Sequence, residues 1–228
     1  MVTRLEILSD PVCPWCYIGK AKLDRALEKR PDHPFNIQWR PFQLNPDMPT
    51  EGMDNAAYLS AKFGGPEGAR KVYARIEQTA LDAGIDVDFS RISRKPNTIN
   101  AHRLLHWAGI EDRQGLVANQ LFHRFFKLGQ DIGATDVLLD VAKTVGMDHT
   151  VTQRLLEGDA DTAEIRAADA RARDMGVTGV PTFILGGKYV LTGAQETDVW
   201  LSVIDEIVEK SQAMDHKPAE PSGLRDTF

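Results

Sequence analysis

Cysteine is scarce in this sequence, because the 228 residues contain only two, Cys13 and Cys16. Disulfide frameworks staple small secreted domains with several bridges, so one closely spaced pair in a chain of this length excludes that class of protein. The N-terminus also lacks the basic and then apolar pattern of a signal peptide. We therefore expect a cytoplasmic protein, in which a cysteine pair is more often catalytic or metal-binding than structural.

Long apolar runs and an excess of basic residues are missing too. No stretch approaches the ~20 continuous apolar residues that a membrane-spanning helix needs, so we expect no membrane partner. The formal net charge is −6 and basic residues are scattered among acidic ones, which argues against nucleic acid as a partner. With 42% hydrophobic residues, the chain can bury the core of one large domain that carries an insertion.

The beginning and the end of the chain predict a sheet. Residues 5–8 form a short apolar run, 15–27 repeat apolar residues at helical spacing, and 35–39 alternate apolar with polar residues. That order favours two parallel strands joined by a right-handed crossover. Near the end, residues 182–185 and 188–191 read as a hairpin with a glycine turn, before a helix over 199–208.

Helices separated by glycine stops are expected in between. They are predicted over 66–83, 97–108, 112–128, a segment that Thr135 caps before Gly146, and 159–175. The elements together predict an α/β fold, with a four-stranded mixed sheet flanked by helices and a large all-helical insertion after the second strand. The predicted domains are 1–42 with 177–212 for the sheet, 43–176 for the helical insertion, and 213–228 for a flexible C-terminal tail.

The two cysteines are three positions apart at the start of the first predicted helix. That spacing is compatible with the ~5.5 Å between Cα atoms that a disulfide prefers, so the pair can close and open reversibly. Unsatisfied N–H groups and the helix dipole lower the pKa of a thiol at this place. We expect Cys13 to be the exposed nucleophile and the more shielded Cys16 to resolve the mixed disulfide.

The second half of the predicted site is the segment 176–182. Pro181 directly precedes an apolar strand, and a proline there belongs at an edge or a bend; we predict a cis bond after Val180. Placed opposite Cys13, the Val180 backbone could pair with an extended substrate peptide. Pro14 and Trp15, between the cysteines, complete the expected substrate-binding residues.

Several assignments stay open at this stage. Trp15 and Phe42 either form an apolar surface for unfolded substrate or cover the core. Asp10 either assists proton transfer to Cys16 or only shapes the turn after the first strand.

Other uses of the cysteines are weaker. A structural zinc site needs four ligands, and the sequence has no second cysteine pair. A cysteine protease needs a histidine base beside its nucleophile, and a neighbouring thiol would make that nucleophile prone to oxidation. His102 and His106 are explained more simply as packed or surface residues of a helix. We expect no metal and no bound cofactor, only a redox-active disulfide.

The sequence resembles the thioredoxin superfamily, since Cys-Pro-Trp-Cys at 13–16 opens a helix and Gly-Val-Pro-Thr-Phe at 179–183 opens the third strand. The helical insertion resembles the DsbA family, and more closely its FrnE-like branch. The motifs that carry this are at 13–19, 40–46, 97–104 and 188–195. The resemblance implies a thioredoxin-like fold and protein-disulfide oxidoreductase or isomerase activity at Cys13, Cys16 and Pro181. Thiol- or disulfide-containing proteins are the implied partners.

Two related groups of enzymes give an alternative function. The 2-hydroxychromene-2-carboxylate isomerases and the kappa-class glutathione transferases have a similar architecture and bind glutathione, which makes glutathione a candidate co-substrate. They place a serine or a lone thiol where this sequence has two cysteines, so Cys16 argues against them. In that alternative, Asn97, Asn100 and His102 would line a small-molecule pocket. A non-enzymatic metal-binding module is a third hypothesis.

Overall fold

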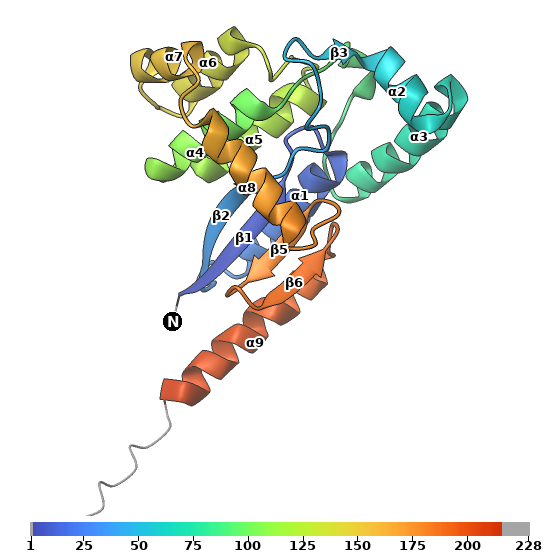
Figure 1. The fold of residues 1–228 in the computed structure, drawn as a ribbon. Helices are drawn as coiled ribbons and strands as arrows, with labels where there is room; N and C mark the ends of the chain where they lie inside the picture. Colours follow the sequence, from blue (N-terminus) through green and yellow to red (C-terminus); the bar gives the residue numbers. More distant parts are fainter. Residues whose placement is uncertain (1, 216–228) are drawn as a thin grey trace, which may run out of the picture.

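The computed structural model describes residues 2–215, and its centre is a four-stranded mixed sheet (Figure 1). The strands are β1 (Thr3–Ser9), β2 (Phe35–Pro41), β5 (Thr182–Leu185) and β6 (Tyr189–Thr192). Their order is β2-β1-β5-β6, with β1 parallel to β2 and antiparallel to β5, and β6 antiparallel to β5. The predicted α/β sheet and its hairpin are therefore confirmed.

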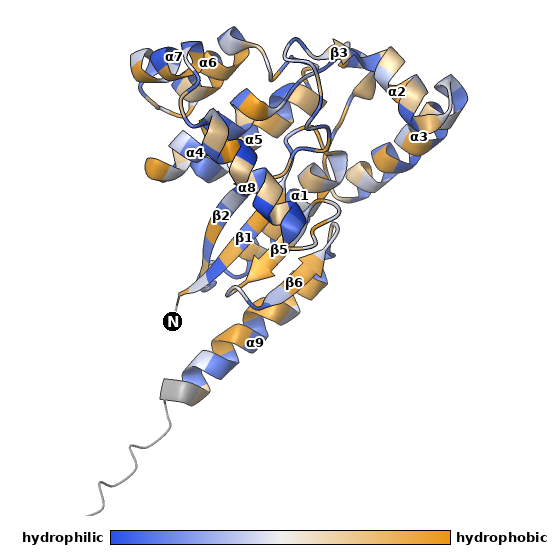
Figure 2. Cartoon of the chain, in the orientation of Figure 1, coloured by the Kyte–Doolittle hydropathy of each residue, from blue (hydrophilic) through white to orange (hydrophobic). Residues whose placement is uncertain are grey.

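Helices α1 (Pro14–Lys29) and α9 (Thr197–Asp215) contact each other and share one apolar core with the sheet. Trp200 of α9 is fully buried, and its ring meets the Phe183 ring of β5 edge-on, with 4.8 Å between the centroids. Figure 2 shows β5 and β6 as mainly hydrophobic, whereas α9 alternates between hydrophobic and hydrophilic residues. Burial of the apolar faces of β1, β5, α1 and α9 is the main force that holds the helices on the sheet.

Helices fill most of the chain between β2 and β5. They are α2 (Asn55–Phe63), α3 (Pro66–Asp82), α4 (Ile99–Ile110), α5 (Gln114–Phe126), α6 (Thr135–Thr144), α7 (His149–Glu157) and α8 (Thr162–Asp174), with a 3-10 turn, η1 (Phe89–Arg91). The expectation of an entirely helical insertion is wrong in one detail. A short antiparallel ladder pairs β3 (Met53–Asp54) with β4 (Arg94–Lys95).

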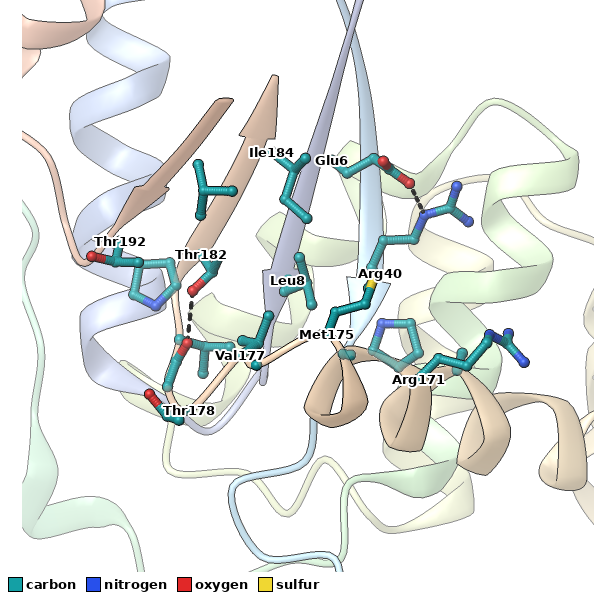
Figure 3. A pocket seen from close by; sticks show the side chains of 18 of the residues that line it. Glu6, Leu8, Arg40, Arg171, Met175, Val177, Thr178, Thr182, Ile184 and Thr192 are labelled. Carbon is teal, nitrogen blue, oxygen red and sulfur yellow. Dashed lines mark hydrogen bonds and ion pairs between the residues drawn. The ribbon is translucent and has the colours of Figure 1, made fainter. Parts of the chain in front are cut away.

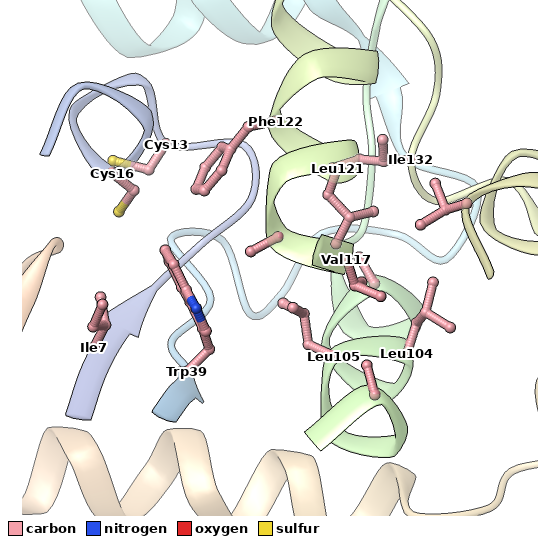
Figure 4. Packing of buried hydrophobic residues seen from close by; sticks show 14 of the residues in the cluster. Ile7, Cys13, Cys16, Trp39, Leu104, Leu105, Val117, Leu121, Phe122 and Ile132 are labelled. Carbon is pink, nitrogen blue, oxygen red and sulfur yellow. The ribbon is translucent and has the colours of Figure 1, made fainter. Parts of the chain in front are cut away.

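The inserted helices are tied to the free edge of the sheet. The side-chain amide of Gln114, at the start of α5, accepts a hydrogen bond from Trp39 N at 2.7 Å and donates one to Trp39 O at 3.1 Å. It thereby satisfies the backbone of β2 as a neighbouring strand would. One apolar cluster continues from β1 and β2 through Phe122 into α4 and α5, and it includes both cysteines (Figure 4).

Some helix ends differ from the predicted ones. Thr135 is the first residue of α6 and Ala134 is its N-cap, so the expected cap is wrong. Helix α9 continues to Asp215, so the predicted flexible tail starts too early at 213, and its remainder, 216–228, lies outside the described residues. Within 2–215, no helix has both the length and the apolar character required to cross a membrane.

Candidate active site

Cys13 lies at the N-terminus of α1, where it is the N-cap residue. Its carbonyl oxygen accepts hydrogen bonds from Cys16 N at 3.1 Å and Tyr17 N at 3.3 Å. Pro14 occupies the first helical turn, where a missing N–H leaves nothing unsatisfied. The sequence thus places one thiol at the positive end of the helix and the other one turn inside it. Both cysteines are free thiols in the structure.

The expectation of an exposed Cys13 is wrong. Its exposed fraction is 2%, against 1% for Cys16, and both belong to the central apolar cluster (Figure 4). The loop before β5 contributes to this burial, because Val180 O lies 3.5 Å from Cys13 Sγ and accepts its hydrogen bond. A substrate therefore reaches the Cys13 sulfur only when this loop, or another segment packed on Cys13, moves.

The two thiols have opposite acidities. The hydrogen bond from the Cys16 thiol lowers the pKa of Cys13, and backbone N–H groups of Cys16 and Trp15 lower it further, against burial and the Asp10 carboxylate. Burial raises the pKa of Cys16 well above its ordinary value, and the hydrogen bond and charge of Cys13 add to that. Cys13 is therefore the thiol that ionises, and Cys16 keeps its proton.

The loop that precedes β5 faces this pair. The Val180–Pro181 peptide bond is cis, which is the isomer that the sequence predicted. Pro181 O accepts a hydrogen bond from Gly193 N at 2.8 Å, which ties the loop to the end of β6. Helix α1 approaches the loop at Gly19, where an added Cβ would lie 3.1 Å from Pro181 Cγ. Glycine at that position allows the close contact between helix and loop.

The two aromatic candidates for a substrate surface have different places. Trp15 is 36% exposed beside the cysteines, so its ring is open to a partner. Phe42 is buried against Leu8 and Ala172, and the Arg173 guanidinium lies over its ring at 4.2 Å. Phe42 is a core residue, and only Trp15 remains available to substrate.

Buried charged groups lie close to the pair. Asp10 shapes the turn, which is one of its two predicted roles, by accepting hydrogen bonds from Val12 N at 3.4 Å and Leu44 N at 2.7 Å. It is also fully buried. Its carboxylate opposes ionisation of Cys13. Lys95 of β4 is buried, and its Nζ donates a hydrogen bond to Val12 O at 3.2 Å. The sequence did not predict it as part of the site. A single lysine before a proline, in a segment without periodicity, does not reveal that it is buried.

The structure does not gather Asn97, Asn100 and His102 around one pocket. The Asn97 amide donates to Met48 O at 2.6 Å, and Asn100 Oδ1 accepts from Arg103 Nη1 at 2.8 Å, so both side chains serve internal hydrogen bonds. His102 alone lines a cavity, of about 120 Å³. Its Nε2 lies 3.9 Å from Asp10 Oδ1, and burial lowers its pKa. The internal hydrogen bonds of Asn97 and Asn100 do not favour a joint pocket with His102, and that pocket stays a prediction.

A larger groove, of about 950 Å³, lies on the sheet face that α1 and α9 do not cover (Figure 3). Leu8 and Ile184 line it from the strands, Met175 and Arg171 from the end of α8, and the loop around Val180 closes one side. Its size falls in the range of ligand sites, and its apolar floor suits an extended apolar segment. The sequence did not predict it, since it arises from the packing of α8 on a distant sheet.

Metal-binding potential is limited in the part of the chain that the structure describes. His106, Asp161 and Glu164 bring one ligand atom each within 4.8 Å of one another, but both carboxylates are exposed. Asp161 already accepts a hydrogen bond from Trp107 Nε1 at 2.7 Å. Neither cysteine joins a group of three ligands within residues 2–215, so a cysteine zinc site receives no support.

Comparison with known proteins agrees with the fold. The model of the DSBA-like thioredoxin domain family matches residues 4–205. The chain is 28% identical to the uncharacterized protein YwbO of Bacillus subtilis over 211 residues, which cover 92% of this chain and 100% of YwbO. A probable DsbA oxidoreductase of Streptomyces coelicolor has a TM-score of 0.80 at 26% identity, over 99% of this chain and 100% of that one.

Two further solved structures share the fold at lower identity. A 2-hydroxychromene-2-carboxylate isomerase has a TM-score of 0.67 at 17% identity, over 94% of this chain and 100% of its own. The cytosolic disulfide reductase DsbM of Pseudomonas aeruginosa has a TM-score of 0.66 at 19% identity, over 91% and 99%. This set agrees with the FrnE-like branch to which the motifs pointed. The chain belongs to the DSBA-like thioredoxin domain family, whose members are disulfide oxidoreductases.

Proposed function

We propose that this protein exchanges disulfides with protein substrates through Cys13 and Cys16. The observation that carries the proposal is the position of two free thiols one helical turn apart at the start of α1, with Cys13 Sγ 3.5 Å from Val180 O. The opposite shifts of their pKa values support it. In this proposal, residues 1–42 and 177–212 carry the chemistry and the inserted residues 43–176 cover it. The cysteine usage favours the cytoplasm as its place of action.

The proposed disulfide exchange proceeds in two steps. A substrate thiolate attacks the Cys13 sulfur of the Cys13–Cys16 disulfide, which forms a mixed disulfide and releases Cys16, and Cys16 takes up a proton. A second substrate thiolate then attacks the substrate sulfur of the mixed disulfide, and Cys13 leaves as a thiolate. The substrate is oxidised to a disulfide, and the enzyme is reduced. The reverse sequence reduces a substrate disulfide.

The acidity of Cys13 favours its role as the leaving group in the second step. A thiol with a lowered pKa leaves faster, although each unit of acidity also weakens it as a nucleophile. The same shift stabilises the reduced enzyme, by roughly 1.4 kcal/mol for each pKa unit. The raised pKa of Cys16 keeps that thiol protonated, so it does not compete for the substrate.

Substrate binding follows from the loop and from Trp15. In the free protein, the Val180 carbonyl accepts a hydrogen bond from the Cys13 thiol. Once that thiol has reacted, the carbonyl is available to an N–H group of an extended peptide. The exposed Trp15 ring supplies apolar contact area beside the sulfur. These two contacts favour unfolded or extended segments of proteins as substrates.

The test is insulin reduction and refolding of a scrambled disulfide protein. Cys13→Ser should abolish both activities, and Cys16→Ala should accumulate a mixed disulfide with the substrate. Ser202→Ala, on the exposed face of α9, is the control and should keep full activity. Retained activity in Cys13→Ser would refute the proposal.

A glutathione-dependent isomerase or transferase is the second candidate function. It is favoured by the likeness to a 2-hydroxychromene-2-carboxylate isomerase over nearly the whole chain, and one DsbM structure contains GSH. In that case Cys16→Ala should leave turnover of a small aromatic substrate intact, with an absolute requirement for glutathione. Failure of both results would remove this candidate, and glutathione would remain only a co-substrate that reduces or oxidises the cysteine pair.

A further inference from the structure

Lys95 is a buried cation next to the redox pair. Its exposed fraction is 5%, and its Nζ donates a hydrogen bond to the carbonyl oxygen of Val12, the residue that precedes Cys13. The rings of Tyr58 and Phe125 flank the ammonium, with their centroids 5.2 and 5.4 Å from Nζ. Within residues 2–215, Lys95 forms no ion pair with a carboxylate.

A buried ammonium without a direct counter-ion is costly, because water no longer solvates it. Burial accordingly lowers the pKa of Lys95 to about 8, while the charges of Asp10 and Cys13 act in the opposite direction and favour its protonated form. Asp10 is the larger of these two charges, and its oxygens also accept hydrogen bonds from two backbone N–H groups. The Cys13 thiolate is the second anion that favours the Lys95 ammonium, and it is the one that depends on the redox state of the pair.

We propose that Lys95 is a positioning residue whose ammonium stabilises the Cys13 thiolate. This inference rests on the proposed function only in taking Cys13 as the thiolate that forms in the reduced protein. The favourable interaction between the two charges is reciprocal. The Cys13 thiolate favours the protonated form of Lys95, and the Lys95 ammonium stabilises the thiolate to the same extent. The insertion then sets part of the chemistry of the pair, through a residue of β4.

Apart from Asp10, the neighbouring ionisable groups supply no negative charge to Lys95. Lys62, on α2 beside Tyr58, is a like charge and opposes protonation of Lys95. Tyr73 stays neutral, since burial raises its pKa to about 12. His102, whose Nε2 lies 3.9 Å from Asp10 Oδ1, is kept neutral near pH 7 by burial, which lowers its pKa.

The inference predicts a different protonation of Lys95 in the two redox states. Reduction of the disulfide adds two electrons and one proton, which gives a thiolate at Cys13 and a protonated thiol at Cys16. The oxidised pair carries no charge at Cys13, so Lys95 loses one of its two favourable neighbours and releases its proton at lower pH. Near pH 8, reduction therefore takes up part of a second proton, at Lys95.

The experiment measures the Cys13 thiolate in the reduced full-length protein, by absorbance at 240 nm and by the alkylation rate against pH. Lys95→Met should raise the midpoint of the thiolate titration, which lowers the thiolate fraction about tenfold at any pH where the thiolate is the minor form, as expected for the loss of a nearby opposite charge. It should also shift the equilibrium with glutathione about tenfold toward the disulfide form, equivalent to about 30 mV. Lys95→Arg should restore both values to within twofold.

The matched control is Lys62→Met, which removes the same charge from an exposed residue whose Nζ donates to the Tyr58 hydroxyl at 2.7 Å, and which should change both values by less than twofold. A folded Lys95→Met variant with an unchanged thiolate titration would overturn the inference. Should that variant not fold, the Cε resonance of Lys95 in the native protein gives the answer. Its titration should move to lower pH on oxidation, and equal midpoints in both redox states would overturn the inference as well.

These readouts need no protein substrate. If the native protein fails to reduce insulin but Lys95→Met loses thiolate, the proposed function is refuted and the role of Lys95 stands. If the native protein reduces insulin and the thiolate is unchanged in Lys95→Met, the role of Lys95 is refuted and the proposed function stands.

Discussion

Removing the Cys16 thiol should make Cys13 far less acidic. The Cys16 hydrogen bond is the largest cause of the lowered pKa of Cys13, and burial of Cys13, which acts in the opposite direction, persists in the variant. A hydrogen bond to a charged acceptor is worth about 1.5–3 kcal/mol, and 1.4 kcal/mol is a factor of ten in an equilibrium constant. Cys16→Ala should therefore lower the Cys13 thiolate fraction about tenfold to a hundredfold, at any pH where the thiolate is the minor form.

Absorbance at 240 nm against pH is the direct assay, and alkylation followed by intact mass gives an independent value. Cys13 is the single cysteine of the Cys16→Ala variant, so the titrating thiol is assigned to it unambiguously. Cys16→Ser, which keeps an O–H donor at the same place, is the matched comparison and should lie between Cys16→Ala and the native protein. A Cys16→Ala variant that titrates at the native pH would show that another group sets the acidity of Cys13.

Three further predictions concern stability. Arg103→Met should lower the unfolding free energy in urea by about 3 kcal/mol or more, because the guanidinium donates to three backbone carbonyls within 155–160 that would lose their partner; an unchanged midpoint and slope would contradict this. The folded-state pKa of Lys95, about 8, lies below the ordinary lysine value of 10.5, so the folded protein loses this proton first. The stability of the native protein relative to Lys95→Met should then rise between pH 8 and 10.5, by about 3 kcal/mol, and a flat difference would argue against a buried ammonium. Gly129→Ala should cost more than Gly186→Ala, because both glycines have positive φ but only at 129 would a Cβ lie 2.3 Å from the Arg91 oxygen; equal thermal midpoints would contradict the close contact.

The parts of the site that depend on neighbouring residues in the sequence, at Cys13 and at Pro181, could be predicted. An apolar strand, a turn and a cysteine before Pro14 specify a helix N-terminus, and those signals lie within a few residues of one another. The same holds for Pro181, which stands directly before the apolar strand β5. Two short helices were missed because few of their residues are buried, although Asp54 and Asp148 cap them and were visible signals.

The covered half of the site was not readable. The burial of Cys13 depends on Val180, 167 positions away, and on the packing of the inserted helices, neither of which leaves a periodic pattern near residue 13. Lys95 is buried by Tyr58 and Phe125 from two different helices. Sequence periodicity describes one face of one element, so contacts assembled from several distant elements escape it.

The most direct test of a reversible bond between the two sulfurs is a thiol count in glutathione redox buffers. The reduced protein is equilibrated over a range of ratios of reduced to oxidised glutathione, quenched with an alkylating reagent, and weighed intact. A single transition from two alkylated thiols to none, absent in Cys13→Ser, is the expected result. A protein that keeps both thiols in the most oxidising buffer, or that gains only glutathione adducts, would contradict the account.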